Sequence, residues 1–338
     1  MSATIVDGDA LDALRFLPDG SARCCVTSPP YWGLRDYGVS GQLGLERTPQ
    51  EYVAAMVAVF REVRRVLADD GTLWLNLGDS YNGYMANQRA TSISAANQES
   101  RPVFKSGHGR RTETLKNKDL VGIPWRVAFA LQEDGWWLRS DIIWAKPNPM
   151  PESVTDRPTK AHEYLFLLSK SARYFYDADA IATAPAQTSI DRLSQSTLAE
   201  QNGSSRVPGK TNGNMRAVFG GRAKAAGSVT RRHSGREDEG NYIENGVNAR
   251  TVWTIATQPF KEAHFATFPP ELPRRCILAG SAVGDTVLDP FAGAGTTLLV
   301  ADRLGRHGLG IELNPTYAEM ARNRIRSDAP LFYTEAQG

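Results

Sequence analysis

The fold is decided by the stretch TVLDPFAGAGTT, which occupies residues 286–297 of the 338-residue chain. The apolar run that ends at Leu288 predicts a strand, and the run from Thr296 to Ala301 predicts the start of a helix. Glycines between a strand and a helix let a ligand approach the backbone closely. The stretch therefore predicts the ligand-binding turn of an α/β fold.

The next strand is predicted at residues 308–313, and it contains an acid near its end, Glu312. Glu312 lies 23 residues after Asp289, close to the spacing at which a carboxylate binds ribose hydroxyls in such folds. The alternative for Glu312 is a solvated charge at a strand end. Leu298 stands where the G-x-G-x-x-G fingerprint requires its third glycine, which argues against a nicotinamide or flavin dehydrogenase.

A second motif, TSPPYW at residues 27–32, follows the short apolar run Cys24–Val26. Its two prolines lack N–H donors and fix two φ angles, so the turn is rigid and its carbonyls stay free to accept hydrogen bonds. Ser28 adds a hydroxyl acceptor, and Tyr31 adds an aromatic face with a polar tip. Such a turn suits a planar ring that carries an exocyclic amine. The alternative is an ordinary proline-rich turn after a strand.

The clearest helix of the chain is predicted between Thr48 and Leu67. Thr48 is a good N-cap, Pro49 suits the first helical position, and Glu51 completes a capping box. Apolar residues then recur on one face of the helix. We expect this face to pack on a sheet.

Strands and helices alternate along the remaining chain. Further helices are predicted at residues 10–17 and 123–133, and strands at residues 4–6, 72–77, 136–144, 163–168, 173–176 and 252–255, with 163–168 and 173–176 as a hairpin. Alternation of this kind indicates a mostly parallel sheet with ligands at the carboxyl ends of its strands. Asp9, Ser28, Asp289 and Glu312 would then share one crevice.

Four residues near these motifs have two interpretations each. Asp79 follows the strand at 72–77, and we expect it to cap a loop rather than to touch substrate. Trp32 either supports a stacked ring or packs in the core. Arg35 and Asp36 either contact nucleic acid or pair with each other inside their loop.

The net charge of +2 is too small to indicate nucleic-acid binding by itself, but the charge is unevenly distributed. Residues 181–250 hold ten Lys or Arg against six Asp or Glu, in a segment rich in Gly, Ser, Asn and Gln. Residues 83–119 form a second basic, polar stretch. Basic segments of this kind commonly contact phosphates, although a charged surface loop is the ordinary alternative.

These features predict an organisation in four parts. Residues 1–180 and 251–326 form two parts of one α/β domain. Residues 181–250 are a basic insertion. Residues 327–338 form a C-terminal tail.

Three cysteines make neither a disulfide framework nor a metal cluster, and five histidines without paired spacing give no case for a metal. Cys24 and Cys25 are adjacent on a predicted strand and should point to opposite faces as small core residues. No apolar run approaches the ~20 residues of a membrane span, and the N-terminus lacks the pattern of a signal peptide. We expect a soluble, cytoplasmic protein.

Together, these stretches resemble the β-class amino DNA methyltransferases, which methylate exocyclic amines of bases. The resemblance rests on TSPPYW at 27–32 preceding DPFAGAG at 289–295, so that the catalytic motif lies upstream of the cofactor motif. It extends to the opening segment through Asp9, to GTLWLNLGD at 71–79, SDIIWAKPNP at 140–149 and HFATFPP at 264–270. It implies a Rossmann-like, doubly wound, mostly parallel sheet with permuted motif order and an inserted target-recognition region. Residues 1–180 would then be the catalytic part of the α/β domain and residues 251–326 its cofactor-binding part. Residues 181–250 would be the first candidate for target recognition, and residues 83–119 the second.

The resemblance also implies the cofactor, S-adenosyl-L-methionine, and a set of site residues. The catalytic residues would be Ser28, Pro29, Pro30 and Tyr31, with the Ser28 hydroxyl and the Pro29 carbonyl accepting hydrogen bonds from the target amine. The cofactor-binding residues would be Asp9, Phe268, Asp289, Phe291, Gly293, Gly295, Thr296 and Glu312. Asp9 would lie near the adenine amine, and Glu312 would bind the ribose hydroxyls.

Ser28 bears on which base is methylated. Family members with Ser at this position mostly methylate N4 of cytosine, and members with Asp mostly methylate N6 of adenine. We therefore expect an N4-cytosine methyltransferase acting on a flipped base in double-stranded DNA, with N6-adenine as the alternative. A non-catalytic protein that binds cofactor and DNA is the alternative from another class. A cognate restriction endonuclease and a homodimer remain open, as does the recognised sequence.

Overall fold

The computed structural model describes residues 3–83, 112, 114–188, 191, 247–258 and 267–328. Contacts between residues divide the chain into two units, Met1–Asp177 with Arg250–Gly338, and Ala178–Ala249. Within the second unit, Thr183 and Val247 exchange backbone hydrogen bonds as an antiparallel bridge. The first unit carries the sheet and its helices.

The sheet has eight strands. In spatial order they are β1 (Ala3–Asp7), β8 (His307–Glu312), β7 (Thr286–Asp289), β2 (Ala22–Thr27), β3 (Leu67–Leu77), β5 (His162–Ser169), β4 (Trp137–Ala145) and β6 (Val252–Thr254). Every neighbouring pair is parallel except the two pairs that contain β5. The predicted doubly wound, mostly parallel sheet is therefore confirmed.

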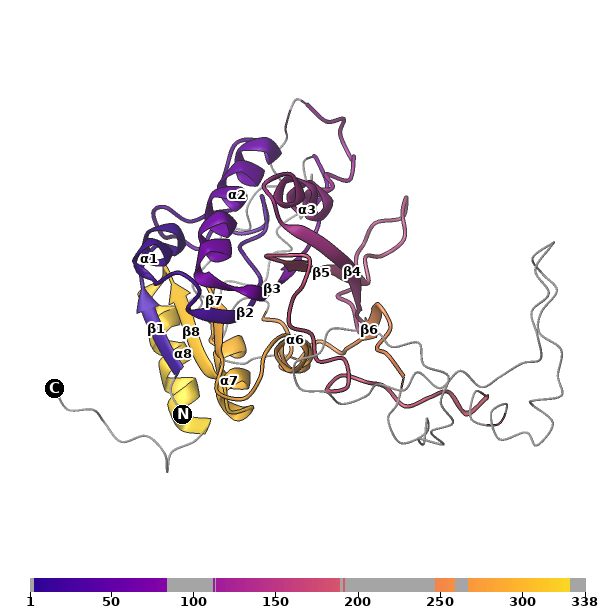
Figure 1. Ribbon diagram of the computed structural model, residues 1–338. Coiled ribbons are helices and arrows are strands. Elements are labelled where there is room, and N and C mark those ends of the chain that lie inside the picture. Colours follow the sequence, from indigo (N-terminus) through magenta and orange to yellow (C-terminus); the bar gives the residue numbers. More distant parts are fainter. Residues whose placement is uncertain are drawn as a thin grey trace, which may run out of the picture. The chain divides into compact units, whose positions relative to one another are not determined.

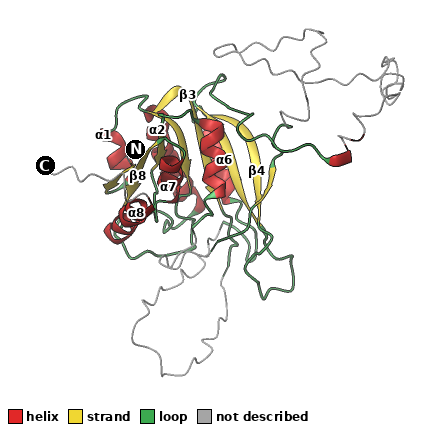
Figure 2. Ribbon diagram, turned by 90° about the horizontal axis from the view of Figure 1, so that it is seen from below, coloured by secondary structure: helices red, strands yellow, loops and turns green. Residues whose placement is uncertain are grey.

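Helices cover both faces of this sheet. They are α1 (Ala10–Phe16), α2 (Pro49–Val66) and α3 (Ile123–Glu133) on one face, and α6 (Glu271–Gly280), α7 (Thr296–Arg303) and α8 (Pro315–Asp328) on the other (Figures 1 and 2). Cys24 and Cys25 mark the two faces, because Cys25 packs with α2 and α3 whereas the Cys24 sulfur lies beside Gly280 of α6. Both thiols are buried, as predicted, and burial raises the pKa of Cys24 to about 12.

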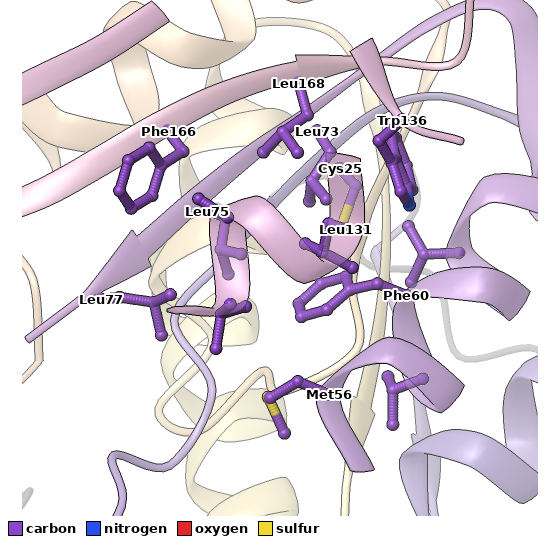
Figure 3. Close-up of a cluster of buried hydrophobic side chains, with 14 of the residues drawn as sticks. Cys25, Met56, Phe60, Leu73, Leu75, Leu77, Leu131, Trp136, Phe166 and Leu168 are labelled. Atoms are coloured by element: carbon purple, nitrogen blue, oxygen red, sulfur yellow. The ribbon is translucent and has the colours of Figure 1, made fainter. Parts of the chain in front are cut away.

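The larger part of the core lies between the sheet and helices α2 and α3. Figure 3 shows Met56 and Phe60 of α2 and Leu131 of α3 facing Leu73 and Leu75 of β3. All five side chains are fully buried. Burial of one such side chain stabilises the fold by about 1.5–3 kcal/mol, so this cluster fixes the sheet against α2 and α3.

Helix α2 begins as its sequence predicts. The Thr48 hydroxyl accepts a hydrogen bond from the Glu51 N–H at 3.2 Å, and the Glu51 carboxylate accepts one from the Thr48 N–H at 3.1 Å. Reciprocal bonds of this kind satisfy donors that have no partner inside the helix. The capping box therefore sets the helix start directly after the loop that follows Tyr31.

The predicted hairpin of residues 163–168 and 173–176 is wrong. β5 is antiparallel to β3 on one side and to β4 on the other, and residues 173–176 form no strand. The Phe175 N–H instead donates to the Asp70 carbonyl at 2.8 Å, and the Tyr176 ring stacks on Trp74 with 6.4 Å between centroids. Pairing with two strands distant in sequence replaces the local hairpin because it places β5 in the interior of the sheet.

In the described part of the chain, no helix is long and apolar enough to cross a membrane. Nor does any group of three or more His, Cys, Asp or Glu side chains in these residues have an arrangement that could hold a metal ion.

Candidate active site

Four of the predicted site residues lie along one edge of the sheet. Asp7 of β1 pairs with Glu312 of β8, and Asp289 of β7 pairs with Gly310 of β8. β2 is parallel to β7, so Ser28, which follows β2, emerges at the same edge as Asp289. Asp9 lies two residues beyond β1. Residues separated by almost the whole chain are thus brought together at the carboxyl ends of parallel strands.

A hydrogen bond joins the two motifs directly. The Thr27 hydroxyl donates to Asp289 Oδ1 at 2.6 Å, and the Phe291 N–H donates to the same oxygen at 3.1 Å. Asp289 is only 1 % exposed, and burial raises its pKa to about 6 although both donors favour the charged form. Asp289 therefore holds the turn after β2 at a fixed position relative to the glycine turn after β7.

The glycine turn has the backbone that the sequence predicts. Gly293 has φ 52° and Gly295 has φ 71°, values that favour glycine. A Cβ on Gly295 would lie 2.9 Å from the Cβ of Ala321, so this glycine also lets α7 pack closely on α8. Thr296 is buried at the start of α7, where its hydroxyl accepts a hydrogen bond from Arg324 at 2.9 Å.

Glu312 faces this turn. Its Oε2 accepts a hydrogen bond from the Gly293 N–H at 2.7 Å, and its Oε1 accepts one from the Asn314 N–H at 2.9 Å. Desolvation raises the pKa of the carboxyl above its ordinary value, and these two donors oppose part of the rise. A carboxylate has about four lone-pair sites, so acceptor capacity for the hydroxyls of a ribose remains.

Asp9 and Phe268 have weaker links to these residues. Asp9 caps α1, because its Oδ1 accepts a hydrogen bond from the Asp12 N–H at 3.0 Å. Phe268 is half-buried, three residues before α6, on a segment separate from the strand ends. Their places in a cofactor pocket stay predictions. An adenosyl group needs hydrogen-bond acceptors for its hydroxyls and an apolar surface for its ring. Glu312 provides the acceptors, the glycine turn provides backbone space, and the half-buried Phe291 ring provides the apolar surface, so these residues fit such a group.

The predicted catalytic turn, residues 28–31, is held by a chain of hydrogen bonds. Ser28 Oγ donates to Tyr31 Oη at 3.2 Å, and Tyr31 Oη lies 2.7 Å from Glu163 Oε2 and 3.1 Å from Asn76 Oδ1. Burial raises the pKa of Tyr31, and the neighbouring Glu163 charge raises it further, so the residue remains a neutral phenol. The Ser28 hydroxyl is thus oriented by a fixed partner.

The expectation that the proline carbonyls stay free is wrong for Pro30. Its carbonyl accepts a hydrogen bond from the hydroxyl of Tyr52 at 2.9 Å. Tyr52 is fully buried on α2, so this bond anchors the turn to the core. Among the carbonyls of the two prolines, Pro29 is the better candidate for a contact with substrate.

Glu163 and Lys146 were not identified from the sequence. Glu163 lies at the start of β5 and pairs in register with Trp144 of β4. Lys146 follows β4, forms an ion pair with Glu163, and holds its ammonium 4.2 Å from the centroid of the Trp144 ring. The only sequence signal was a single acid at the start of an otherwise apolar run, which predicts a strand end more readily than a site.

Asp79 and Trp32 have the structural roles that were weighed for them. Asp79 Oδ1 accepts hydrogen bonds from the N–H groups of Gly122 and Ile123 at 2.9 and 3.0 Å. Asp79 therefore has a capping role, but it caps the start of α3 and not a loop. Trp32 is 2 % exposed and donates to the Glu46 carbonyl at 3.0 Å, as expected of a core residue.

The chain is similar to DNA methyltransferases in both sequence and fold. A family model described as DNA methylase matches residues 22–323. The Type II methyltransferase M.Cfr9I of Citrobacter freundii is 45 % identical over 330 residues, which are 96 % of this chain and 88 % of that protein.

Two solved structures share the fold. The PvuII DNA methyltransferase (cytosine-N4-specific) gives a TM-score of 0.59 at 18 % identity, over 100 % of this chain and 89 % of that one. A Thermus thermophilus protein complexed with S-adenosyl-L-methionine gives 0.55 at 24 % identity, over 98 % and 97 %. With a family match across most of its length, the chain belongs to the N6/N4 DNA methylase family and is a Type II DNA methyltransferase.

Proposed function

We propose that the chain transfers a methyl group to the exocyclic N4 amine of a flipped cytosine in double-stranded DNA. The observation that carries the proposal is the Thr27–Asp289 hydrogen bond of 2.6 Å. It fixes Ser28, the next residue, beside the glycine turn that begins after Asp289. An amine bound at Ser28 would therefore lie next to a cofactor bound at that turn.

S-adenosyl-L-methionine, the methyl donor of this enzyme class, supplies an electrophilic methyl group on a sulfonium. Glu312 would bind its ribose hydroxyls, and Gly293 and Gly295 would let it approach the backbone. Asp289 and Phe291 would border the same pocket. Asp9, Thr296 and Phe268 complete the proposed set, with Asp9 near the adenine amine.

The residues of the turn act on a poor nucleophile, because the lone pair of an exocyclic amine is delocalised into its ring. Acceptors that draw the N–H groups out of the ring plane localise this pair on nitrogen. We assign this action to the Ser28 hydroxyl and the Pro29 carbonyl. Both are fixed before reaction, so they stabilise the positive charge that develops on nitrogen without reorganising.

Such chemistry cannot reach an amine inside a stacked duplex, so the target base would have to leave the stack. Tyr31 would then stack against the flipped base. Ser28 favours cytosine, because relatives with Ser at this position mostly methylate N4. N6 of adenine remains the alternative, since a neutral hydroxyl is also able to orient the adenine amine.

Target recognition is assigned to the basic segment 181–250 and, as the second candidate, to 83–119. Most of both segments lies outside the described residues, so the assignment depends on charge and composition. Residues 1–180 and 251–326 would supply the catalytic and cofactor parts of one domain. Residues 327 and 328 of the predicted tail belong to α8, and the rest of it, 329–338, lies outside the described residues. A cognate restriction endonuclease in the same system is part of this proposal.

Methyl transfer from S-adenosyl-L-methionine labelled in the methyl group tests the substrate class. Duplex DNA should take up the label, and unlabelled duplex should compete for transfer whereas RNA should not. Folded protein that binds cofactor and leaves DNA unlabelled would refute the proposal. Preferential competition by RNA would assign the enzyme to a different substrate.

A further inference from the structure

A chain of hydrogen bonds leads from the catalytic turn to a charged residue outside the turn. Ser28 Oγ donates to Tyr31 Oη at 3.2 Å, and Tyr31 Oη lies 2.7 Å from Glu163 Oε2. No strong base was evident in the sequence motifs, and the structure places a carboxylate two hydrogen bonds away from Ser28. We propose that Glu163 accepts, through Tyr31 and Ser28, the proton that the target amine loses when it is methylated.

The direction of the chain follows from the protons available. Tyr31 has one hydroxyl proton and two acceptors within reach, Glu163 Oε2 at 2.7 Å and Asn76 Oδ1 at 3.1 Å. A hydrogen bond to an ionised acceptor is shorter and about twice as strong as a neutral one, so Tyr31 donates to Glu163. Asn76 Nδ2 is engaged with the Tyr164 carbonyl at 3.1 Å, which fixes the orientation of that amide. Every hydroxyl from Ser28 onward then points toward the carboxylate.

The proton balance of the step is complete. When the amine nitrogen gains the methyl group, it carries a positive charge and must lose a proton to become the neutral product. Its N–H bond breaks, and the electron pair stays on nitrogen. The proton passes to Ser28 Oγ, the Ser28 proton passes to Tyr31 Oη, and the Tyr31 proton passes to Glu163 Oε2. The hydroxyls are restored, and the carboxylate ends as a carboxylic acid that returns its proton to water before the next turnover.

Two lysines interact with Glu163 besides Tyr31. Lys146, which follows β4, forms an ion pair with Glu163 Oε1 and leaves Oε2 for Tyr31. Lys160, on the segment before β5, donates to the Asp79 carbonyl at 2.7 Å, and its charge also interacts with Glu163. Burial lowers the pKa of Lys160, and the charges of Asp79 and Glu163 oppose part of this fall. Tyr31 and these two lysines thus interact with the carboxylate, and Oε2 is the oxygen in reach of the Tyr31 proton.

The competing explanation for Glu163 is that its ion pair with Lys146 only stabilises the sheet. Three variants distinguish this structural role from proton acceptance. Glu163→Gln retains an acceptor for the Tyr31 hydroxyl but removes the group that gains a proton. Tyr31→Phe retains the ring and breaks the chain in its middle. Glu62→Gln on α2 is the matched control, because Glu62 is also partly buried and paired, with Arg65 at 2.8 Å.

The measurement is the single-turnover rate constant for methyl transfer to duplex DNA at saturating cofactor, with thermal unfolding and cofactor affinity recorded for each variant. We expect Glu163→Gln and Tyr31→Phe each to lose about 100-fold in rate while cofactor affinity stays within about twofold. The double variant should be no slower than the slower single variant, because both changes break one pathway. Glu62→Gln should match the wild type.

The pH profile adds a readout that a structural role would not change. The wild-type rate constant should depend on pH through its proton acceptor, and Glu163→Gln should lose this dependence. A folded Glu163→Gln variant with an undiminished rate constant, or losses that multiply in the double variant, would overturn the inference.

The inference rests on the proposed function, and the same assay separates the two failures. If the wild type itself forms no methylated cytosine, the proposed function is wrong. If the wild type is active but Glu163→Gln keeps the full rate constant, or the losses multiply in the double variant, only the role of Glu163 is wrong.

Discussion

At the residue scale, the site depends on side chains whose hydrogen bonds are satisfied inside the protein. Asp289 accepts from Thr27 and Phe291, Glu312 accepts from Gly293 and Asn314, and Ser28 donates to Tyr31. Groups held in this way do not have to reorganise when a ligand arrives, and fixed dipoles are the usual source of transition-state stabilisation. Replacing each residue should therefore change a different property: turnover, cofactor affinity or stability.

Replacing Ser28 by Ala should separate turnover from cofactor binding. The change removes one proposed acceptor of the target amine and leaves the glycine turn intact, so we expect turnover to fall by about 100- to 1000-fold. Calorimetric titration with S-adenosyl-L-methionine should give a nearly unchanged dissociation constant. A comparable loss of cofactor affinity would show that Ser28 has been assigned to the wrong ligand.

Replacing Glu312 by Ala should mainly weaken cofactor binding. Hydrogen bonds to a charged group are worth about 1.5–3 kcal/mol, so we expect the dissociation constant to rise about 10- to 100-fold. Glu312→Gln is the matched variant, because its amide oxygen still accepts from one of the two N–H donors. A normal dissociation constant in Glu312→Ala would refute the ribose role.

Asp289 should make stability depend on pH in a definite direction. Its pKa is about 6 in the folded protein against 3.8 ordinarily, so the native state binds more protons than the unfolded state between these values. Its contribution to the free energy of unfolding therefore falls as the pH rises through this window. Asp289→Asn lacks the effect, so its stability relative to wild type should improve by up to about 3 kcal/mol between about pH 4 and about pH 7. Urea unfolding of both proteins across this range measures the difference, and a difference independent of pH would contradict the assignment.

At the scale of elements, the end of β3 supports the catalytic turn. A Cβ on Gly78, the residue after β3, would lie 2.5 Å from the Cε2 atom of Tyr31, so the ring occupies space that only glycine leaves open. The next residue, Asp79, caps α3. Gly78 thus helps to position the Tyr31 ring, and Asp79 helps to position helix α3.

Replacing Gly78 by Ala should displace Tyr31 without unfolding the protein. The new methyl group collides with a ring that is held at its hydroxyl, so the Ser28–Tyr31–Glu163 chain should lengthen. We expect a fall in turnover of at least about tenfold, as is typical for a misplaced reacting group, with little change in the unfolding temperature. Wild-type turnover in a folded Gly78→Ala variant would show that the position of Tyr31 is not critical.

Some of these helices and strands could be predicted from the sequence and others could not. Helix α2 was predictable because its capping box and apolar face are local, and α3 was predicted with the bounds it has. β5 was predicted as a strand but paired wrongly, since its partners lie about 90 and 25 residues earlier and periodicity carries no information on pairing. Helices α6 and α8 were not predicted. Glu163 was not identified for the same reason. It lies beside Tyr31 only because β5 is inserted next to β3, and no pattern in the sequence indicates that pairing.

At the scale of the whole molecule, two motifs far apart in sequence form one site because β2 and β7 are neighbours in the sheet. The adjacency of these strands brings the motifs together, although the motifs lie far apart in the sequence. This arrangement accounts for a methyltransferase, and the family match confirms one. The proposal of cytosine rather than adenine rests on Ser28, so the methylated product has to be identified directly.

The most direct test is the identity of that product. DNA from cells that express the chain, hydrolysed to nucleosides and resolved by mass spectrometry, should contain N4-methylcytosine, with DNA from cells expressing Ser28→Ala as the control. We expect N4-methylcytosine with the wild type and little or none with Ser28→Ala. N6-methyladenine in place of N4-methylcytosine, or no methylated base at all, would contradict it.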